Sequence, residues 1–378
     1  MATKKKKGFT FSDKCMLIGH VPGLAGLILG ILAGSLDPRA HIIIAFFGLA
    51  YPLFLLANAL FFLYWLFRKR WAIASITLIV VGIGWHSLFA TFGLGGTEGP
   101  ERKTDPDLLR LLTYNVHNFK PYGESNTVEE KDKIFQILAG QMPDIVCFQE
   151  FYSRDKGPYD TIDSLKKQLD MPYYYFEPTH KSKREALGVA IFSRFPIENR
   201  GAIAFENSTG NSSIYVDVRV HNQLLRIYNV HLQSISFEKE DYSYLDQVTK
   251  EMDPALDPSK RIIRMLRGAF KKRSEQVDIM KAHMQTCRLP YVVAGDFNDT
   301  PASYATTRMT DSLYNAFYEK GSGFGKTYNG KFPNFQIDYI ACTKNIQVMN
   351  YKIIKARLSD HFPVRSDLRL PLSGDVSE

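Results

Sequence analysis

Cysteine is scarce in this chain, and its placement excludes two kinds of site. The 378 residues contain four cysteines, Cys15, Cys147, Cys287 and Cys342, and no two of them stand in a C-x-x-C spacing. The sequence therefore indicates neither a disulfide framework nor a zinc site. Cys147 and Cys342 lie inside apolar runs, where a buried thiol acting as a small hydrophobic side chain is the expected role.

The chain also lacks a P-loop and a G-x-G-x-x-G motif, so a glycine-rich phosphate-binding loop does not explain its function. We find no internal repeat. Acidic residues are outnumbered, with 39 Asp and Glu against 47 Lys and Arg, which gives a formal net charge of +8. This charge favours a polyanionic partner or an anionic surface.

What the sequence has in excess is an apolar N-terminal region. Three apolar stretches follow a basic N-terminus, 1–14, and each exceeds the roughly 20 residues that cross a bilayer core. The sequence therefore predicts three transmembrane helices, at about 15–36, 41–67 and 71–94. A cleaved signal peptide is the alternative for the first stretch, but two more stretches follow it directly.

The charged loops indicate an orientation. Lys4–Lys7 and Arg68–Arg70 fall on the same side of the membrane if there are three spans, and basic loops face the cytoplasm. The third span then leaves the membrane outward. We expect an integral protein of a bacterial inner or plasma membrane whose remaining chain is extracytoplasmic. An even number of crossings would invert this prediction.

Beyond the apolar region the chain reads as a soluble α/β domain. Residues 95–108, rich in glycine, proline and charge, predict a linker, 109–370 a catalytic domain and 371–378 a tail. Continuous apolar strands predict sheets that are covered on both faces, hence a two-sheet sandwich with helices outside. The expected strands are 109–116, 144–149, 173–177, 188–192, 213–220, 224–230, 291–295, 337–342 and 348–354, and the expected helices are 128–141, 159–169 and 274–286.

Residues 260–273 form a basic amphipathic pattern without an acidic residue. At 100° per residue, Lys260, Arg264, Arg267 and Lys271 share one face, and apolar side chains take the opposite arc. One interpretation is a surface helix that packs its apolar face on the core. The other is contact of the basic face with anionic lipid headgroups or with a nucleic-acid backbone.

Acidic, amide and imidazole groups stand at the ends of several apolar strands. Glu150 ends one strand and Asn115 ends another, while Asp296 and Asn298 lie two residues apart beyond a third. Such oxygens suit Mg²⁺ or Mn²⁺ in phosphoester hydrolysis. Asp338 lies within an apolar strand, where an acid is costly unless it is paired, and His361 is the natural partner.

The order of these motifs resembles the endonuclease/exonuclease/phosphatase superfamily, which has the DNase I-like fold, a four-layered α/β sandwich. The resemblance covers about 109–370. It rests on the segments Thr113–Val116, Asp144–Glu150, Leu187–Arg194, Asn229–Leu232, Gly295–Asn298, Ile337–Tyr339 and Ser359–Val364.

The resemblance also implies roles for individual residues. Glu150 would be the main metal ligand, assisted by Asn115 and Asp360. Asp296 and Asn298 would position or deprotonate the attacking water. His361, oriented by Asp338, would contact the phosphate or act as the base, and His231 would contact a phosphate oxygen or the leaving group.

These features predict a membrane-tethered, Mg²⁺-dependent phosphodiesterase that uses in-line attack by water. Phospholipid, sphingolipid or phosphoinositide headgroups are the favoured substrates, since a tether holds the enzyme at a two-dimensional substrate. A membrane-anchored nuclease acting on DNA or RNA is the alternative, although His117 stands where abasic-site nucleases carry an acid. A catalytically silent scaffold that binds anionic ligands is a third hypothesis.

Overall fold

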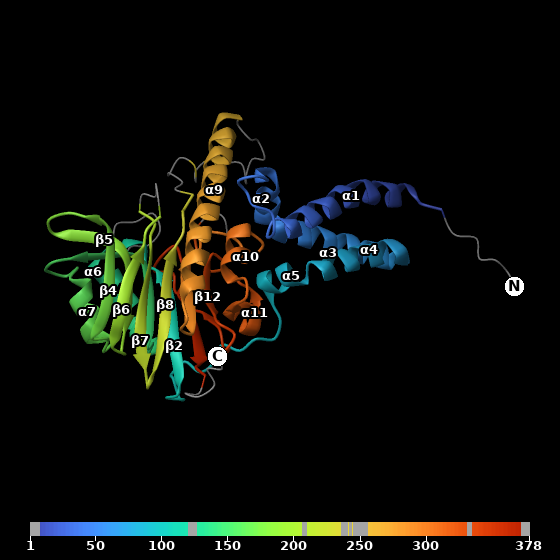
Figure 1. Ribbon diagram of the computed structural model, residues 1–378. Helices are drawn as coiled ribbons and strands as arrows, with labels where there is room; N and C mark the ends of the chain where they lie inside the picture. Colours follow the sequence, from blue (N-terminus) through green and yellow to red (C-terminus); the bar gives the residue numbers. More distant parts are fainter. Residues whose placement is uncertain are drawn as a thin grey trace.

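The computed structural model of the protein describes residues 8–119, 127–205, 210–235, 241, 244, 256–330 and 335–371 (Figure 1). Two expected features, the Lys4–Lys7 run and all but the first residue of the 371–378 tail, lie outside these ranges. The described chain forms a β-sandwich covered by helices, from which a group of N-terminal helices projects to one side (Figure 1).

Two large sheets form the sandwich in the described part of the chain. The first has the strand order β13-β15-β2-β3-β5-β4, with β14 also paired to β15, and the second has the order β10-β12-β9-β8-β7-β6. The strands of the first sheet are β2 (Leu108–Asn115), β3 (Ile145–Arg154), β4 (Tyr173–Lys181), β5 (Glu185–Ser193), β13 (Gln347–Val348), β14 (Lys352–Ile353) and β15 (Val364–Arg369). Those of the second are β6 (Ile197–Ile203), β7 (Ser213–Val220), β8 (Gln223–His231), β9 (Tyr291–Asp296), β10 (Tyr314–Asn315) and β12 (Asp338–Cys342).

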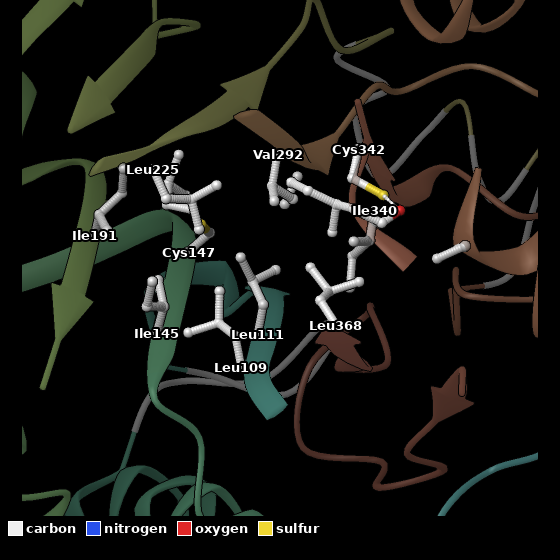
Figure 2. Packing of buried hydrophobic residues seen from close by; sticks show 14 of the residues in the cluster. Leu109, Leu111, Ile145, Cys147, Ile191, Leu225, Val292, Ile340, Cys342 and Leu368 are labelled. Carbon is white, nitrogen blue, oxygen red and sulfur yellow. Dashed lines mark hydrogen bonds between the residues drawn. The ribbon is translucent and has the colours of Figure 1, made fainter. Parts of the chain in front are cut away.

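The main core lies between the two sheets (Figure 2). Alternate residues of each central strand point into it, as Leu109 and Leu111 of β2 and Ile145 and Cys147 of β3 do. Leu112 and Tyr114 of β2 and Val146 and Phe148 of β3, which alternate with the residues of the main core, belong to a second cluster under helices. Both faces of these strands are therefore buried, which explains their continuous apolar runs.

Helices cover the outer faces. On the first sheet lie α6 (Val128–Gln141) and α7 (Thr161–Gln168), and on the second lie α9 (Leu256–Thr286) and α10 (Tyr304–Thr310). A 3-10 turn, η1 (His117–Phe119), follows β2, and the short helix α11 (Ala316–Lys320) follows β10. The Thr127 side chain caps α6 by accepting from the backbone N–H of Glu130. The layers run helix, sheet, sheet, helix, so the predicted four-layered sandwich is confirmed.

Several predicted elements differ from the structure. The helices expected at 260–273 and 274–286 are one helix, α9, and the strand expected at 348–354 is split into β13 and β14. We did not predict β6 or β15. The sequence of β15 conceals it, because Arg365 and Asp367 interrupt its apolar residues. Both are fully buried, and Asp367 pairs with Arg110 of β2, with an Nε to Oδ1 distance of 2.6 Å.

The three continuous transmembrane helices that we expected are corrected by the structure. One helix, α1 (Phe11–Leu32), is by itself long and apolar enough to span a membrane. The second stretch divides into α2 (Ile42–Leu49) and α3 (Tyr51–Phe67), bent by 63°. The third divides into α4 (Trp71–Ile83) and α5 (Trp85–Thr91), bent by 72°. Only if each bent pair counts as one span do the described residues offer three.

Proline and glycine explain the two bends. Pro52 stands in the first turn of α3, where its missing N–H begins a helix more readily than it continues one. Gly84 separates α4 from α5, and a Cβ on it would lie 2.5 Å from the end of the Ile31 side chain, so glycine leaves room for this side chain of α1. At about 1.5 Å per residue, the 13 residues of α4 extend only about 20 Å.

The N-terminal helices expose many apolar side chains and bury several polar ones. Large apolar side chains are exposed along α1, α3 and α4, among them Ile18, Leu56 and Ile79. Asp13 is fully buried and pairs with Arg68, with an Oδ1 to Nε distance of 2.8 Å. This distribution is the reverse of that in a soluble helical bundle and suits an apolar surrounding.

The bent helices join this bundle to the catalytic sandwich. The Phe46 ring of α2 packs edge-on against Phe270 of α9, and the His86 ring of α5 stacks on Tyr318 of α11. A two-residue strand after α5, β1 (Phe92–Gly93), pairs with β11 (Gly323–Phe324) of the sandwich. The bundle is thus packed against the domain rather than tethered by a free linker.

The second sheet depends on a close approach between β8 and β9. Gly295 of β9 has a φ of +142°, and a Cβ there would lie 2.0 Å from the carbonyl oxygen of Val230 in β8. Any side chain at position 295 would therefore both strain the backbone and push the two strands apart.

We predict that Gly295→Ala lowers the free energy of unfolding by roughly 2 to 4 kcal/mol, because overpacking and backbone strain add. Thermal unfolding of the detergent-solubilised protein, followed by circular dichroism, measures the loss. Gly268→Ala on α9 is the matched control, since its Cβ would meet nothing within 4 Å. It should leave stability unchanged or raise it slightly. Equal unfolding temperatures for Gly295→Ala and wild type would contradict the prediction.

Candidate active site

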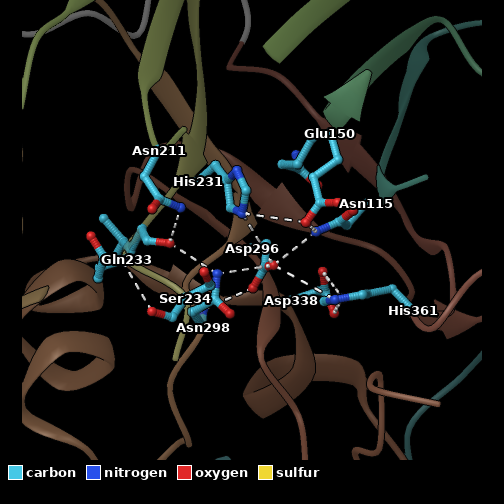
Figure 3. A network of polar contacts seen from close by, with 12 residues as sticks. Asn115, Glu150, Asn211, His231, Gln233, Ser234, Asp296, Asn298, Asp338 and His361 are labelled. Carbon is cyan, nitrogen blue, oxygen red and sulfur yellow. Dashed lines mark hydrogen bonds and ion pairs between the residues drawn. The ribbon is translucent and has the colours of Figure 1, made fainter. Parts of the chain in front are cut away.

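Polar side chains converge where β2, β3, β8, β9 and β12 meet (Figure 3). The positions of three of these side chains follow from the register of the strands. His231 at the end of β8 pairs with Asp296 at the end of β9, and Asp296 pairs with Asp338 at the start of β12. Three titratable residues thus form one row across three neighbouring strands, with Asp296 in the middle.

The distances within this row are short, and all three residues are buried. The Nε2 atom of His231 lies 3.8 Å from Oδ2 of Asp296. The exposed fractions are 4% for His231 and 1% for each of the two aspartates. An isolated buried carboxylate is costly, so this row depends on the partners that surround it.

The first sheet contributes Asn115 and Glu150. The Nδ2 of Asn115 donates to Glu150 Oε1 at 3.2 Å and to Asp296 Oδ2 at 3.1 Å, so it links the two sheets. Glu150 has a φ of +49° and stands at an irregularity in the pairing of β3 with β5. The bulge turns Glu150 out of the strand, and its side chain remains 30% exposed beside the buried row.

Asn298 closes the site on the side of β8. Its backbone N–H donates to Asp296 Oδ1 at 2.8 Å, and its Nδ2 donates to the Leu232 carbonyl at 2.9 Å and to Asp296 Oδ2 at 3.2 Å. A φ of +55°, which asparagine tolerates better than most residues, permits this turn. Asn298 and Asp296 therefore act as one hydrogen-bonded unit.

His361 enters the row from the loop before β15. Its Nδ1 lies 2.9 Å from Asp338 Oδ2, and its Nε2 lies 3.7 Å from Asp296 Oδ2. The Tyr328 ring packs edge-on against the imidazole, with centroids 5.2 Å apart. Asp338 thus fixes the ring so that its other nitrogen points toward Asp296. The pairing of His361 with Asp338 is the one that the sequence predicted.

The surroundings change the pKa of each group. Burial alone would lower the pKa of His361, but Asp338 and Asp296 raise it well above its ordinary value. Burial raises the pKa of Asp296 to about 7, with His361 opposing and Asp338 adding to the rise. Burial lowers the pKa of His231. Near neutral pH, these shifts favour a charged His361, a neutral His231 and an Asp296 that can exchange a proton.

Glu150 differs from the row in its ionisation. Burial acts to raise the pKa of Glu150, but nearby His231 and His117 and the hydrogen bond from Asn115 outweigh it and lower the pKa. The carboxylate is therefore ionised at neutral pH and partly open to solvent, which are the properties of a cation ligand.

Asp360 and His117 lie at the edge of the site. His117 Nδ1 is 3.8 Å from Asp360 Oδ1, and the Asp360 side chain is 13% exposed. The Ser359 hydroxyl lies 3.2 Å from the same carboxylate and is itself bonded to the Asn115 carbonyl. Asp360 is thereby attached to the end of β2, next to Asn115.

The four basic residues predicted for surface contact are not part of this site. Lys260, Arg264, Arg267 and Lys271 are exposed on α9. The opposite face of α9 is covered by α2, with Ile262, Leu266 and Phe270 in one cluster with Ala45. The apolar face of this segment is therefore buried, but it packs against α2 of the N-terminal region and not on the core of the sandwich.

Sequence reasoning missed Arg273. This residue is 1% exposed, its Nε lies 3.0 Å from Asp299 Oδ2, and its guanidinium donates to the carbonyl of Asn298. The signal was available, because position 273 follows Ile262 by 11 residues, or about three helical turns, and so lies on the apolar face. From the sequence, we assigned Arg273 to neither face of the 260–273 segment.

The loop that Arg273 holds also contacts the N-terminal helices. Thr300 Oγ1 lies 3.4 Å from the Gly48 carbonyl of α2. Asp37, between α1 and α2, accepts from the Ser274 hydroxyl at 2.7 Å. The segment that follows Asn298 is thus enclosed between α9 and the N-terminal helices, and the active-site loop is part of their interface.

Two groups of residues could hold a metal ion. Ligand atoms of Asp296, Asp338 and His361 all lie within 4.8 Å of one another. His361 Nδ1 is already committed to Asp338, so this group is better described as a hydrogen-bonded triad. Glu150 and Asn115 present the carboxylate and amide that a hard cation prefers, beside a second carboxylate. For its oxygen to face an ion, the Asn115 amide must turn over.

Comparison with known proteins agrees with this fold. The sequence model of the Endonuclease/Exonuclease/phosphatase family matches residues 112–361, and a domain of unknown function (DUF8431) matches residues 13–91. A search of curated proteins found no match.

Solved structures with the same fold are numerous. An endonuclease/exonuclease/phosphatase from Beutenbergia cavernae has 20% identity and a TM-score of 0.52, over 70% of this chain and 72% of that chain. TDP2 from D. rerio, complexed with a single-strand DNA product, has 16% identity and a TM-score of 0.50, over 70% of this chain and 99% of that chain. At these identities the likeness shows the fold.

The family match covers most of the sandwich and every residue of the row. The chain belongs to the Endonuclease/Exonuclease/phosphatase family and is a phosphoester hydrolase. The resemblance stated from the sequence is thereby confirmed at the level of the family.

We predict that Arg273→Met lowers the free energy of unfolding by about 3 to 5 kcal/mol, because it leaves Asp299 buried without its cation. The double variant Arg273→Met/Asp299→Asn should recover part of this loss, and a double-mutant cycle from urea unfolding measures the coupling. Lys272→Met, at the exposed neighbouring position, is the control and should be neutral. Additive effects in the cycle would refute the pairing.

Proposed function

We propose that the protein is a membrane-tethered phosphodiesterase that requires Mg²⁺ or Mn²⁺ and hydrolyses phosphoester bonds by direct attack of water. The observation that carries this proposal is the row His231, Asp296 and Asp338 beside an ionised, partly exposed Glu150. It combines an acceptor for a proton, cationic or donor groups for phosphoryl oxygens and a ligand for a hard cation.

Glu150, Asn115 and Asp360 would hold the metal ion. The fit rests on the ionised Glu150 carboxylate and on two carboxylates that approach one amide, an arrangement that favours an added positive charge. A bound divalent ion would polarise the phosphoryl group and lower the pKa of a water molecule. The remaining steps depend on side chains of the chain itself.

Asp296 is our candidate for the general base. It is the central residue of the row, and Asn298 holds both of its oxygens in place. A carboxylate whose pKa is near 7 can accept a proton from water under physiological conditions. Asn298 in turn orients the water or the developing phosphorane with its amide.

The two histidines then have different roles. His361, kept charged by Asp338, donates to a phosphoryl oxygen and stabilises the negative charge of the transition state. His231, whose pKa burial lowers, contacts a second phosphoryl oxygen or the leaving group. No side chain needs to form a covalent bond to phosphorus in this scheme.

Lipid headgroups remain our first choice of substrate, because the N-terminal helices expose apolar side chains and pack directly against the active-site loop. A nuclease acting on DNA or RNA is the alternative, and a DNA-bound structure among the proteins of this fold is consistent with it. The exposed basic face of α9 could contact either polyanion. A silent scaffold is the third hypothesis, and retention of a buried, costly set of charges argues against it.

We predict that Glu150→Gln reduces metal-dependent hydrolysis at least about 100-fold, because it removes the main cation ligand and its contribution of several kcal/mol. The full-length protein in nanodiscs is assayed with Mg²⁺ or Mn²⁺ against bis-p-nitrophenyl phosphate, mixed phospholipids and supercoiled DNA. Glu275→Gln, at an exposed position of α9, is the matched control.

The pattern of activity separates the hypotheses. Release of headgroups that disappears in Glu150→Gln, with DNA intact, supports a lipid phosphodiesterase. Nicked DNA with unchanged lipids supports a nuclease. No hydrolysis by wild type, with metal binding demonstrated by calorimetry, would refute the hydrolase.

We also propose that the catalytic domain is extracytoplasmic. Two basic residues of the bundle, Arg68 and Arg70, gather with Asp13 at the end of α1 where the chain begins (Figure 1). At the other end, where the sandwich packs, Arg39 is paired with Asp37 and Asp278. Basic ends of membrane helices face the cytoplasm.

A cysteine-labelling experiment tests the orientation. In a Cys15→Ser/Cys287→Ser background, Asp107→Cys should react with a membrane-impermeant maleimide in intact spheroplasts. Lys14→Cys should react only after permeabilisation; both native residues are exposed. The opposite pattern would place the domain in the cytoplasm.

A further inference from the structure

An apolar groove of about 620 Å³ lies between the bundle and the catalytic domain. Its walls come from α3, α4 and α5 and from two phenylalanines of the sandwich, and they include Leu56, Val81, Leu88, Phe324 and Phe335. The volume falls within the range of about 300 to 1,000 Å³ that small-molecule sites occupy. An apolar groove of this size among lipid-facing helices fits a hydrocarbon chain.

A second, basic pocket of about 310 Å³ adjoins the groove. Four cationic side chains line it: Lys320, Lys326, Lys355 and Arg357. In the described ranges no acidic side chain forms an ion pair with any of them. Glu98, the acidic residue in the lining, is mostly exposed and pairs with Lys352 instead, at 3.4 Å.

The charges of the basic pocket favour an anionic ligand. Burial and the neighbouring Arg357 both lower the pKa of Lys326, so two cations face each other without a carboxylate to compensate them. Such a set of like charges is unfavourable until an anion enters, and phosphate groups bind where lysine and arginine converge.

The groove and the pocket are neighbours that share one wall residue. Phe324 lines both of them. It belongs to β11, which pairs with β1 at the end of α5, so the contact between bundle and sandwich lies at the boundary between the two cavities. A molecule that fills both would pass from the apolar helices to the catalytic domain at this point.

The basic pocket also reaches the segment that carries Asp360 and His361. Asn329 and Phe362 form part of its wall. The backbone N–H of Asn329 donates to the Asp360 carbonyl at 2.6 Å, and Tyr328, its neighbour, packs on the His361 ring. An anion in this pocket would thus be next to the catalytic loop.

We propose that the groove and the basic pocket together bind one anionic phospholipid, with an acyl chain in the groove and the phosphorylated headgroup among the four cations. This lipid site deepens the proposed function, because it names anionic phospholipids as the substrate class. The role of the lipid as a substrate rests on the proposed function. Exposed apolar side chains on α3 and α4 place the open side of the groove in the bilayer, from which such a lipid would enter.

Binding is tested separately from catalysis. Delipidated full-length protein in detergent is titrated with phosphatidylglycerol and with phosphatidylcholine of the same acyl chains, and retention is measured by native mass spectrometry. We expect wild type to hold one phosphatidylglycerol at least about tenfold more tightly than phosphatidylcholine, a difference of roughly 1.4 kcal/mol. A dihexanoyl phosphatidylglycerol should bind more weakly than the long-chain lipid.

Two variants with matched controls address the two cavities. Lys326→Gln/Arg357→Gln should abolish the preference for phosphatidylglycerol, whereas Lys344→Gln/Arg288→Gln should not. Leu56→Trp should weaken the binding of both lipids, because the larger side chain fills the groove. Ile76→Trp on α4 is its control, because residue 76 does not line the groove. The two side chains are similarly exposed, Leu56 by 60% and Ile76 by 51%.

The outcomes separate this inference from the proposed function. Equal retention of both lipids, or retention that no variant changes, would mean non-specific annular lipid and would overturn the inference. Selective binding together with hydrolysis of bis-p-nitrophenyl phosphate but not of the bound lipid would overturn the substrate class alone. Selective binding by a protein that hydrolyses nothing would refute the hydrolase while supporting the lipid site.

Discussion

The active site depends on the register of β8, β9 and β12. A strand slip of one residue turns every side chain to the opposite face, so His231, Asp296 and Asp338 can form a row only in this pairing. Gly295 makes the pairing possible, because its missing side chain lets β9 approach the Val230 carbonyl. The chemistry at the strand ends thus follows from packing one residue earlier, within the core of the sandwich.

The sequence was informative where local pattern and final environment agree. Strands buried on both faces, such as β2 and β3, are continuous apolar runs, and their terminal Asn115 and Glu150 could be predicted as site residues. It failed where long-range partners decide the environment. The buried Arg365 and Asp367 of β15 and the buried Arg273 of α9 looked like surface charges, because the groups that satisfy them are far away in the chain.

The N-terminal helices illustrate the same limit. Their composition predicts membrane contact, but hydropathy does not describe the bends at Pro52 and Gly84 or the packing of α2 on α9 and of α5 on α11. As a result, α2 and α5 contact the catalytic domain, and α2 touches Thr300 two residues beyond Asn298. The apolar region is therefore part of the environment of the active-site loop, in addition to the membrane contact that its composition predicts.

This arrangement bears on how such an enzyme selects its substrate. The catalytic row can act on any phosphoester that presents its phosphorus in line with a water molecule, so the row alone gives little discrimination. Selectivity must come from surfaces beside it. In this chain, apolar N-terminal helices form one of those surfaces, and four cations without an ion pair to an acidic side chain in the described ranges form the next. Binding energy from a distant acyl chain could then position the phosphate against His361, which is how contacts remote from a reacting bond accelerate its cleavage.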